Sequence, residues 1–363
     1  MKITVITPLF SLAGVPLAQL RFARALSKRG YSVDLMIGHI RDKSTFTPPE
    51  NVNPYILNCL NVRTMLWPLV RYLRKEKPSI IFSAEDHLNI LVLIAMLISG
   101  SKAKFSGSSR VTPFDTYSDV LFSKRWVLKQ LSRLVMPRAD ALTCVSEDMV
   151  KQYQRVFKNP PHVCVYNIVV DTESRSRMRE PVNHPWLVHK TQPVLIAAGR
   201  LAPWKGFGDL IDAMALLKNR RSFRLLILGD GPLRSALQEK IDDGGLSESV
   251  QLIGYVNNPL QYFSRSDVFI LSSHVEGLPN VLVEAMLCGC TPVATDCPTG
   301  PREVLQDGKY GYLVPVQNPD ALAAAIERAL DCPIPRPQLE EAIAPFEENR
   351  VIDRHFKILG IHT

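Results

Sequence analysis

The stretch Val268-Phe-Ile-Leu-Ser-Ser-His-Val-Glu276-Gly-Leu-Pro-Asn-Val-Leu-Val-Glu284-Ala-Met-Leu287 contains a strand signal, a turn and a helix signal in succession. The apolar run that ends at Ser272 is typical of a buried strand. Gly277 to Asn280 turn the chain, and Pro279 is well suited to the first turn of the helix that follows. A strand followed directly by a helix is the repeating unit of parallel α/β sheets.

The same alternation runs along the whole chain. Strands are predicted at 3–7, 32–37, 80–83, 104–106, 141–145 and 163–166, then at 194–198, 224–228, 250–253, 268–272 and 291–294. Helices are predicted at 16–28 and from Gly208, Pro232, Pro259, Pro279 and Pro301. The pattern fails between Asp171 and Gln192, which are rich in charge and proline.

The predicted fold class is therefore α/β, with two parallel-sheet domains that face each other across a cleft. The expected boundaries are 1–170 for the first domain, 171–192 for a linker, 193–345 for the second domain and 346–363 for a helix that packs back on the first. Ligands of parallel sheets bind at the carboxyl ends of strands, so the active site is expected in the cleft.

Composition narrows the class of protein. The longest apolar run, Leu88 to Ile98, is about half of the roughly 20 residues that a bilayer-spanning helix needs, and we expect a buried helix there. The seven cysteines are scattered, and Cys288 and Cys290 lack the spacing of a zinc or redox motif. Reduced thiols in a cytoplasmic protein are the simplest interpretation.

Charge is unevenly distributed between the two predicted domains. Residues 1–190 contain 27 Lys and Arg and 14 Asp and Glu, a formal charge of +13, and the remaining residues contain 16 and 21, a charge of −5. A basic domain suggests an acidic partner. No nucleic-acid signature is present, which favours a phosphorylated substrate or an anionic membrane surface.

The loop Gly199-Arg-Leu-Ala-Pro-Trp-Lys-Gly206 directly follows a predicted strand. Arg200 and Lys205 place two cations on it, and its glycines allow backbone amides to approach a ligand. Such a loop suits a diphosphate, although a basic surface loop is the plainer interpretation.

Two further turns join a strand to a helix. Leu228-Gly-Asp-Gly-Pro232 is glycine-rich, but on its own a tight structural turn is the plainer interpretation. Asp296-Cys-Pro-Thr-Gly-Pro-Arg-Glu303 could bring backbone amides to the cleft or only begin a helix.

Glu276 and Glu284 are the most specific candidates. The start of the predicted helix can hold a phosphate, and a carboxylate can accept hydrogen bonds from both ribose hydroxyls. The alternative is that both are solvated surface residues. A glycosidase pair is disfavoured, because an acid and a base on opposite sides of a bond are hard to build from one loop and helix.

With these motifs the chain resembles the family-4 retaining glycosyltransferases of the GT-B fold, which has two Rossmann-like domains. The resemblance covers nearly the whole chain. It is carried, in the family's order, by Gly199-Arg-Leu with Lys205-Gly206-Phe, Gly229-Asp-Gly-Pro, Gly254-Tyr-Val, the Glu-x7-Glu pattern of Glu276 and Glu284, and Thr295-Asp-Cys-Pro-Thr-Gly-Pro-Arg-Glu.

The resemblance implies a role for each site residue. Arg200 and Lys205 would neutralise the donor diphosphate, Glu276 would hold the transferred sugar and Glu284 the ribose. The remaining donor-binding residues would be Gly14, Gly199, Gly229, Tyr255, Val256, Gly277, Leu278, Pro279, Asn280 and Val281. No metal and no cofactor are expected, and the nucleotide sugar, with UDP as the family's usual nucleotide, is a substrate.

The acceptor side departs from the family's pattern. Many relatives have a histidine where this chain has Ser108-Ser109-Arg110. His87 and Arg110 are candidate acceptor residues, with a structural role as the alternative for each. The expected acceptor is a saccharide or a lipid-linked saccharide, and nucleic acid is not an expected partner.

The segment from Lys124 to Met136 mixes basic residues with Trp126 and leucines. It could lie on an anionic membrane, which would place the protein at the inner face, or form an ordinary amphipathic helix. Two other functions stay open: a GT-B-fold nucleotide-sugar epimerase and a catalytically silent binding protein.

Overall fold

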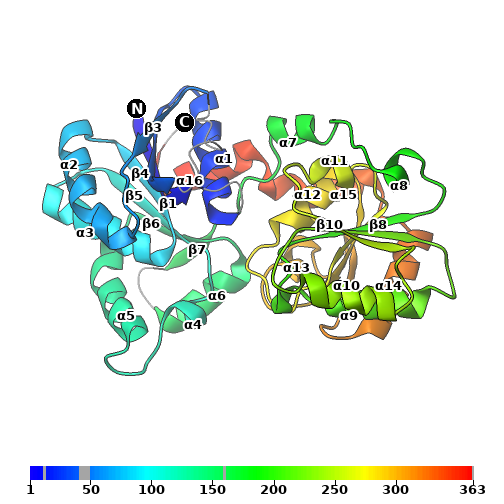
Figure 1. Cartoon of the computed structure of the whole chain (residues 1–363). Coiled ribbons are helices and arrows are strands. Elements are labelled where there is room, and N and C mark those ends of the chain that lie inside the picture. The colour runs from blue at the N-terminus through cyan, green and yellow to red at the C-terminus, as the bar shows by residue number, and fades with distance from the viewer. Residues whose placement is uncertain (11–13, 41–49, 158–160, 362–363) are drawn as a thin grey trace. The chain divides into compact units, whose positions relative to one another are not determined.

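A computed structural model of the protein describes residues 1–10, 14–40, 50–157 and 161–361. These residues form two units, one made of residues 1–168 and 348–363 and the other of residues 169–347 (Figure 1). The whole stretch predicted as a linker, residues 171–192, therefore belongs to the second unit. It contains two short helices, α7 (Thr172–Arg177) and α8 (Pro185–Val188).

The described strands of the first unit form one parallel sheet. They are β1 (Lys2–Phe10), β2 (Ser32–Ile40), β3 (Val52–Ile56), β4 (Ile80–Ala84), β5 (Lys104–Ser109), β6 (Ala141–Cys144) and β7 (His162–Cys164). Their order is β3-β2-β1-β4-β5-β6-β7, and every pairing is parallel.

Helices cover both faces of this sheet (Figure 1). They are α1 (Gly14–Lys28), α2 (Leu66–Glu76), α3 (Asp86–Ser99), α4 (Pro113–Thr116), α5 (Lys124–Val135), α6 (Glu147–Val156) and α16 (Glu348–Ile358), with the 3₁₀ turns η2 (Val62–Met65) and η3 (Met136–Arg138). Because side chains alternate along a strand, Ile3 and Val5 share a core with α1 and α16, whereas Ile6 shares one with α2 and α3.

The second unit contains another parallel sheet in its described residues. Its strands are β8 (Val194–Ala198), β9 (Arg224–Leu228), β10 (Val250–Gly254), β11 (Val268–Leu271), β12 (Thr291–Thr295) and β13 (Tyr312–Val314), in the order β10-β9-β8-β11-β12-β13. Its helical elements are η4 (Pro203–Lys205), α9 (Phe207–Leu217), α10 (Arg234–Asp243), α11 (Leu260–Phe263), α12 (Asn280–Cys288), α13 (Pro301–Val304), α14 (Pro319–Asp331), α15 (Arg336–Ile343) and η5 (Ala344–Phe346).

The sheet of the second unit is also buried on both faces. Val268 and Ile270 of β11 share a core with α9, α10 and α14, whereas Phe269 contacts Phe263 of α11, with ring centroids 5.3 Å apart. Burial on both sides explains why its strands are continuous apolar runs rather than alternating ones.

The α/β fold class is confirmed, and each predicted strand is present. The prediction missed β3 and β13. Each of them is one of the two outer strands of its sheet. The apolar run at 88–98 lies within α3, although Leu97 and Ile98 at its end are exposed. Every helix in the described ranges is too short or too polar to span a membrane.

Candidate active site

The order of strands in the second unit reverses between β8 and β11. From β8 the chain moves to β9 on one side, and from β11 it moves to β12 on the other. At such a point the loops after the two strands diverge, which leaves room for a ligand at their carboxyl ends. The loop at 199–206 follows β8 and the loop at 272–279 follows β11.

Lys205 and Glu276 meet across this point. The Lys205 Nζ lies 2.5 Å from the Glu276 Oε1, and the Ser273 hydroxyl donates a second hydrogen bond of 2.7 Å to the same oxygen. Only 19% of the Lys205 side chain and 10% of the Glu276 side chain are exposed. The two residues predicted to contact the diphosphate and the sugar are therefore neighbours, oriented by each other.

The two loops are joined by further hydrogen bonds. The Ser272 hydroxyl donates to the Lys205 carbonyl at 2.9 Å, and the His274 amide donates to the Trp204 carbonyl at 2.8 Å. His274 Nε2 also lies 2.6 Å from a carboxylate oxygen of Asp209 on α9. These contacts fix the positions of Lys205 and Glu276.

The loop at 295–300 supports Glu276 from the other side. The Thr299 hydroxyl donates to the Glu276 carbonyl, and the Thr295 hydroxyl donates to the Ser273 carbonyl. Thr299 has a φ of +65° and Gly300 a φ of +94°, where an added Cβ would lie 2.5 Å from the Pro279 ring. The segment from Asp296 to Glu303 thus braces the loop of Glu276.

Gly206 allows the two loops to approach. Its φ is +63°, and a Cβ there would lie 1.9 Å from the Ser272 carbonyl oxygen. Gly206→Ala is expected to destabilise the protein by about 2 kcal/mol or more, because it combines left-handed strain with a backbone clash.

The matched control for this prediction is Gly245→Ala. Gly245 has a φ of +61° but only a lysine side-chain tip at 3.5 Å from the added Cβ, so its cost should be about 1 kcal/mol. Urea unfolding measures both values. Equal losses would show that the close approach at Gly206 has no energetic weight.

Close packing also explains why position 229 is a glycine. Its φ is +131°, and a Cβ would lie 1.9 Å from the Gly199 carbonyl oxygen. The Leu201 amide donates to the Asp230 carbonyl at 3.0 Å. The turn after β9 therefore packs directly on the loop of Arg200 and Lys205.

Arg200 itself is exposed, and no carboxylate in the described part of the chain pairs with it.

The helix that carries Glu284 begins one residue later than predicted. Pro279 has a ψ of +79°, which is not helical, so α12 starts at Asn280. Glu284 is half-buried on this helix, and Gly277, Leu278 and Val281 are also half-buried. This arrangement places the start of α12 directly after the loop of Glu276.

Two residues predicted to contact the nucleotide base follow β10. Tyr255 is 64% exposed and Val256 is half-buried. The strand ends at Gly254, whose carbonyl accepts a 2.7 Å hydrogen bond from the Gly229 amide. The loop of Tyr255 thus starts at the same edge of the sheet as the Lys205 and Glu276 loops.

The predicted acceptor residues lie in the first unit. There the strand order changes direction between β1 and β4, and Gly14 begins the helix after β1 with a φ of +60°. His87 follows β4 and is exposed, with its Nε2 3.3 Å from the Glu85 carboxylate. Arg110 donates a hydrogen bond to the Asn167 side chain, and burial lowers the pKa of Arg110 to about 10.

Glu85 is a candidate acceptor-side residue that the sequence analysis missed. It has a φ of +78°, a strained conformation for a residue with a side chain, and such strain is concentrated at functional sites. Burial raises the pKa of Glu85, while the charges of His87 and Arg110 lower it. The signal was available, because two acidic residues follow a buried strand.

The neighbouring carboxylate of Asp86 has a structural role. It accepts hydrogen bonds from the hydroxyls of Ser109 at 2.5 Å, Tyr117 at 2.6 Å and Tyr153 at 2.6 Å. Burial raises the pKa of Asp86. These bonds anchor the start of α3, which carries His87 and directly follows Glu85.

His162 makes the stability of the first unit depend on pH. It is buried, its ring nitrogens have no hydrogen-bond partner in the described structure, and burial lowers its pKa to about 4. Between pH 6.5 and 4 the unfolded chain binds a proton that the folded chain does not. Stability should therefore fall on acidification, by up to about 1.4 kcal/mol per pH unit from this group.

The variant His162→Phe tests this expectation. Its ring would keep the contact with Tyr153, whose ring centroid lies 4.6 Å from that of His162. Unfolding free energies measured by urea from pH 7 to pH 4 should fall less steeply in the variant than in the unmodified protein. Parallel curves would contradict the assignment.

Comparison with solved structures identifies the fold as GT-B. The structure of Anabaena HepE in complex with UDP and glucose aligns with a TM-score of 0.74 at 20% identity, over 99% of both chains. The apo structure of the lipopolysaccharide outer core galactosyltransferase WaaB aligns with a TM-score of 0.72 at 18% identity, over 99% of both chains.

Comparison of sequences identifies the family. Residues 14–174 match glycosyltransferase family 4, and residues 179–344 match the glycosyl transferases group 1. The chain belongs to the family-4 glycosyltransferases, as its motifs predicted, and is a glycosyltransferase by class.

Two relatives cover about two thirds of the chain. An uncharacterised glycosyltransferase of Methanocaldococcus jannaschii is 28% identical over 281 residues, which are 69% of this chain and 68% of the relative. The N-acetylgalactosamine-N,N'-diacetylbacillosaminyl-diphospho-undecaprenol 4-alpha-N-acetylgalactosaminyltransferase of Campylobacter jejuni is 31% identical over 245 residues, which are 67% of this chain and 64% of the relative.

Proposed function

We propose that the protein is a retaining glycosyltransferase that moves a hexose or N-acetylhexosamine from a UDP-sugar to a hydroxyl group of a saccharide or lipid-linked saccharide. The observation that carries the proposal is the Lys205–Glu276 pair, whose side chains are largely buried at the point where the strand order of the second sheet reverses. The HepE structures with UDP and with UDP-glucose support the choice of donor.

The site chemistry follows from where charge develops. Breaking the bond between the sugar C1 and the diphosphate leaves negative charge on the diphosphate, and Arg200 and Lys205 are the cations that would stabilise it. Glu276 would hold the sugar hydroxyls and Glu284 the ribose. The acceptor oxygen forms the new bond to C1 on the face that the diphosphate leaves, and its proton goes to a diphosphate oxygen.

This chemistry needs no metal, and we propose that the reaction is metal-independent. The proposed setting is the synthesis of a cell-surface polysaccharide or glycoconjugate in the cytoplasm, at the inner face of the membrane. A lipid-linked acceptor is supported by the diphospho-undecaprenol named for the Campylobacter relative.

A panel of nucleotide sugars tests the proposal. The purified protein, in buffer with EDTA, should slowly release UDP from a UDP-hexose or UDP-N-acetylhexosamine and from no other nucleotide sugar. Recovery of an isomerised nucleotide sugar would identify an epimerase instead. No turnover of any donor, with or without added divalent metal, would identify a binding protein.

A further inference from the structure

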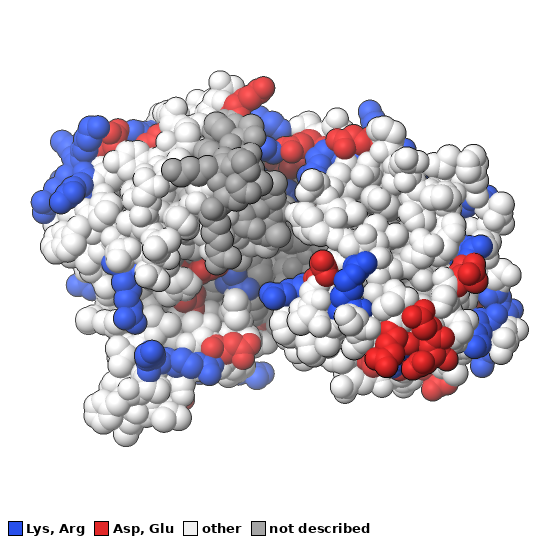
Figure 2. All heavy atoms as spheres, in the orientation of Figure 1, with Lys and Arg blue, Asp and Glu red and all other residues white. Residues whose placement is uncertain are grey.

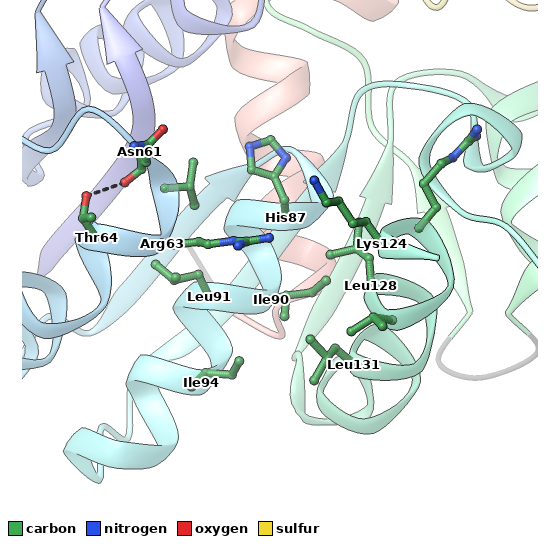
Figure 3. Close-up of a pocket in the computed structure, with 13 residues that line it drawn as sticks. Asn61, Arg63, Thr64, His87, Ile90, Leu91, Ile94, Lys124, Leu128 and Leu131 are labelled. Atoms are coloured by element: carbon green, nitrogen blue, oxygen red, sulfur yellow. Dashed lines mark hydrogen bonds between the residues drawn. The ribbon is translucent and has the colours of Figure 1, made fainter. Parts of the chain in front are cut away.

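The first unit contains a groove of about 910 Å³ between α3 and α5, with η2 at one end (Figure 3). It lies outside the Lys205–Glu276 site, which belongs to the second unit. Ile90, Leu91 and Ile94 line it from α3, and Leu128 and Leu131 from α5. These positions are one turn apart on each helix, so each helix presents an apolar face to the groove.

The described chain does not cover this apolar lining. Val127 and Leu131 on α5 are 44% and 39% exposed, whereas the helix buries Lys129, Ser132 and Val135. The helix therefore packs on the first unit through a face that includes two polar residues, and part of its apolar surface remains open. An open apolar groove of this size is typical of a ligand site.

One end of the groove is positively charged. Figure 3 shows the side chains of Arg63, Lys124 and His87 gathered at this end, with Ile94 and Leu131 at the other. Arg63 and Lys124 are exposed, and no carboxylate of the described residues pairs with either. Arg125 differs, because it donates a hydrogen bond to the Phe114 carbonyl. Two unpaired cations beside an apolar surface complement an anion attached to a hydrocarbon.

The position of the charged end relates the groove to the acceptor. His87 is the second residue of α3, which follows β4. It therefore lies with Glu85 at the carboxyl edge of the sheet. A saccharide attached to an anion that binds Arg63 and Lys124 would be held at this edge.

The segment that enters α5 has the composition of a membrane-contacting loop. Val120, Leu121 and Phe122 are 69%, 66% and 85% exposed, and Lys124 and Arg125 follow after Ser123. Exposed apolar residues followed by cations favour the interface of an anionic bilayer. Figure 2 shows Lys and Arg spread over the visible face of the first unit, whereas acidic side chains gather on the second.

We infer that this groove binds the lipid carrier of the acceptor, a polyprenyl phosphate or diphosphate, with its first isoprene units against α3 and α5 and its phosphate on Arg63 and Lys124. The inference rests on the proposed function, because it names the carrier of the acceptor. A purely apolar partner, such as a helix of another protein, would leave the two cations without a counter-charge.

Binding of two isoprenoid phosphates to the intact protein tests the inference. Geranylgeranyl phosphate should bind about a hundredfold more tightly than dimethylallyl phosphate, because each buried methylene adds affinity. Inorganic phosphate should bind weakest. Fluorescence titration is suitable because Trp126 lies on α5. Equal affinities for the two isoprenoid phosphates would overturn the inference.

Variants locate the site. Arg63→Glu and Lys124→Glu should each weaken geranylgeranyl phosphate binding by about tenfold or more, and Leu131→Glu should do the same from the apolar end. The charge control is Lys102→Glu, an exposed lysine outside the groove, and the apolar control is Leu97→Glu, which is 51% exposed on α3. Both controls should bind like the unmodified protein. If the control variants lost as much affinity as the groove variants, the assignment of the binding site to this groove would be wrong.

Phosphatidylglycerol vesicles separate the carrier from the bilayer. Because Lys124 adjoins the exposed segment of Val120 to Phe122, Lys124→Glu should weaken vesicle binding more than Lys102→Glu, and of these two variants only Lys124→Glu should also weaken geranylgeranyl phosphate binding. A specific defect of Lys124→Glu on vesicles, with none on geranylgeranyl phosphate, would assign the groove to bulk lipid and overturn the inference. These titrations contain no donor, so the inference and the proposed donor chemistry can fail separately.

Discussion

Glu276→Ala is expected to lower kcat/KM for sugar transfer by about a thousandfold, the range seen when one preorganised polar contact to a transition state is removed. The Glu276 carboxylate is 10% exposed and is held by Lys205 Nζ and the Ser273 hydroxyl. The carboxylate would therefore need no rearrangement to hold the sugar hydroxyls as the bond to the diphosphate breaks. Transfer of radiolabelled sugar measures the effect.

Two controls make the Glu276 result specific. Glu239→Ala removes an exposed carboxylate from α10 and should leave transfer unchanged. Glu276→Gln keeps the shape and should recover only a small part of the activity, since an amide pairs poorly with Lys205. Near-normal transfer by Glu276→Ala, with a normal unfolding curve, would remove Glu276 from the mechanism.

Lys205→Ala is expected to cause a loss of similar size, but with a different signature. Because Lys205 would contact the leaving diphosphate, the variant should bind UDP more weakly and also turn over more slowly. The Lys205 backbone is fixed by the Ser272 hydroxyl, so the loop should keep its place. Calorimetric titration with UDP and transfer kinetics measure the two effects.

The matched control for Lys205 is Lys218→Ala, which removes an exposed lysine of the second unit. The double variant of Lys205 and Glu276 gives a further test. Since the two side chains touch at 2.5 Å, their effects should fall well short of additivity. Fully additive losses would show that the two residues act independently.

Much of the fold was predictable because the inner strands are buried on both faces and therefore form apolar runs. The two missed strands lack that signal. β3 contains Pro54, which only an outer strand tolerates, and four of its five residues are exposed. β13 has only three residues, and two of them, Tyr312 and Leu313, are half-buried rather than buried.

The candidate site was predictable at the level of residue types and their strand ends. Placing Lys205 and Glu276 after β8 and β11 indicated a common ligand, but not that the two side chains would pair directly. That contact depends on Gly206 and on the support of Thr299, which no local pattern specifies. The sequence shows that Glu85 and Asp86 follow a buried strand, but the strained backbone that distinguishes Glu85 is visible only in the structure.

The first unit is built from both ends of the chain. Phe356 and Leu359 of the C-terminal segment complete the same core as Ile3 and Val5, with all residues of the second unit synthesised between them. On the ribosome this core therefore forms only after α16 has been synthesised, when the second unit is already complete. Deletion of α16 should thus disturb the fold of the N-terminal sheet before it affects the Lys205 and Glu276 loops.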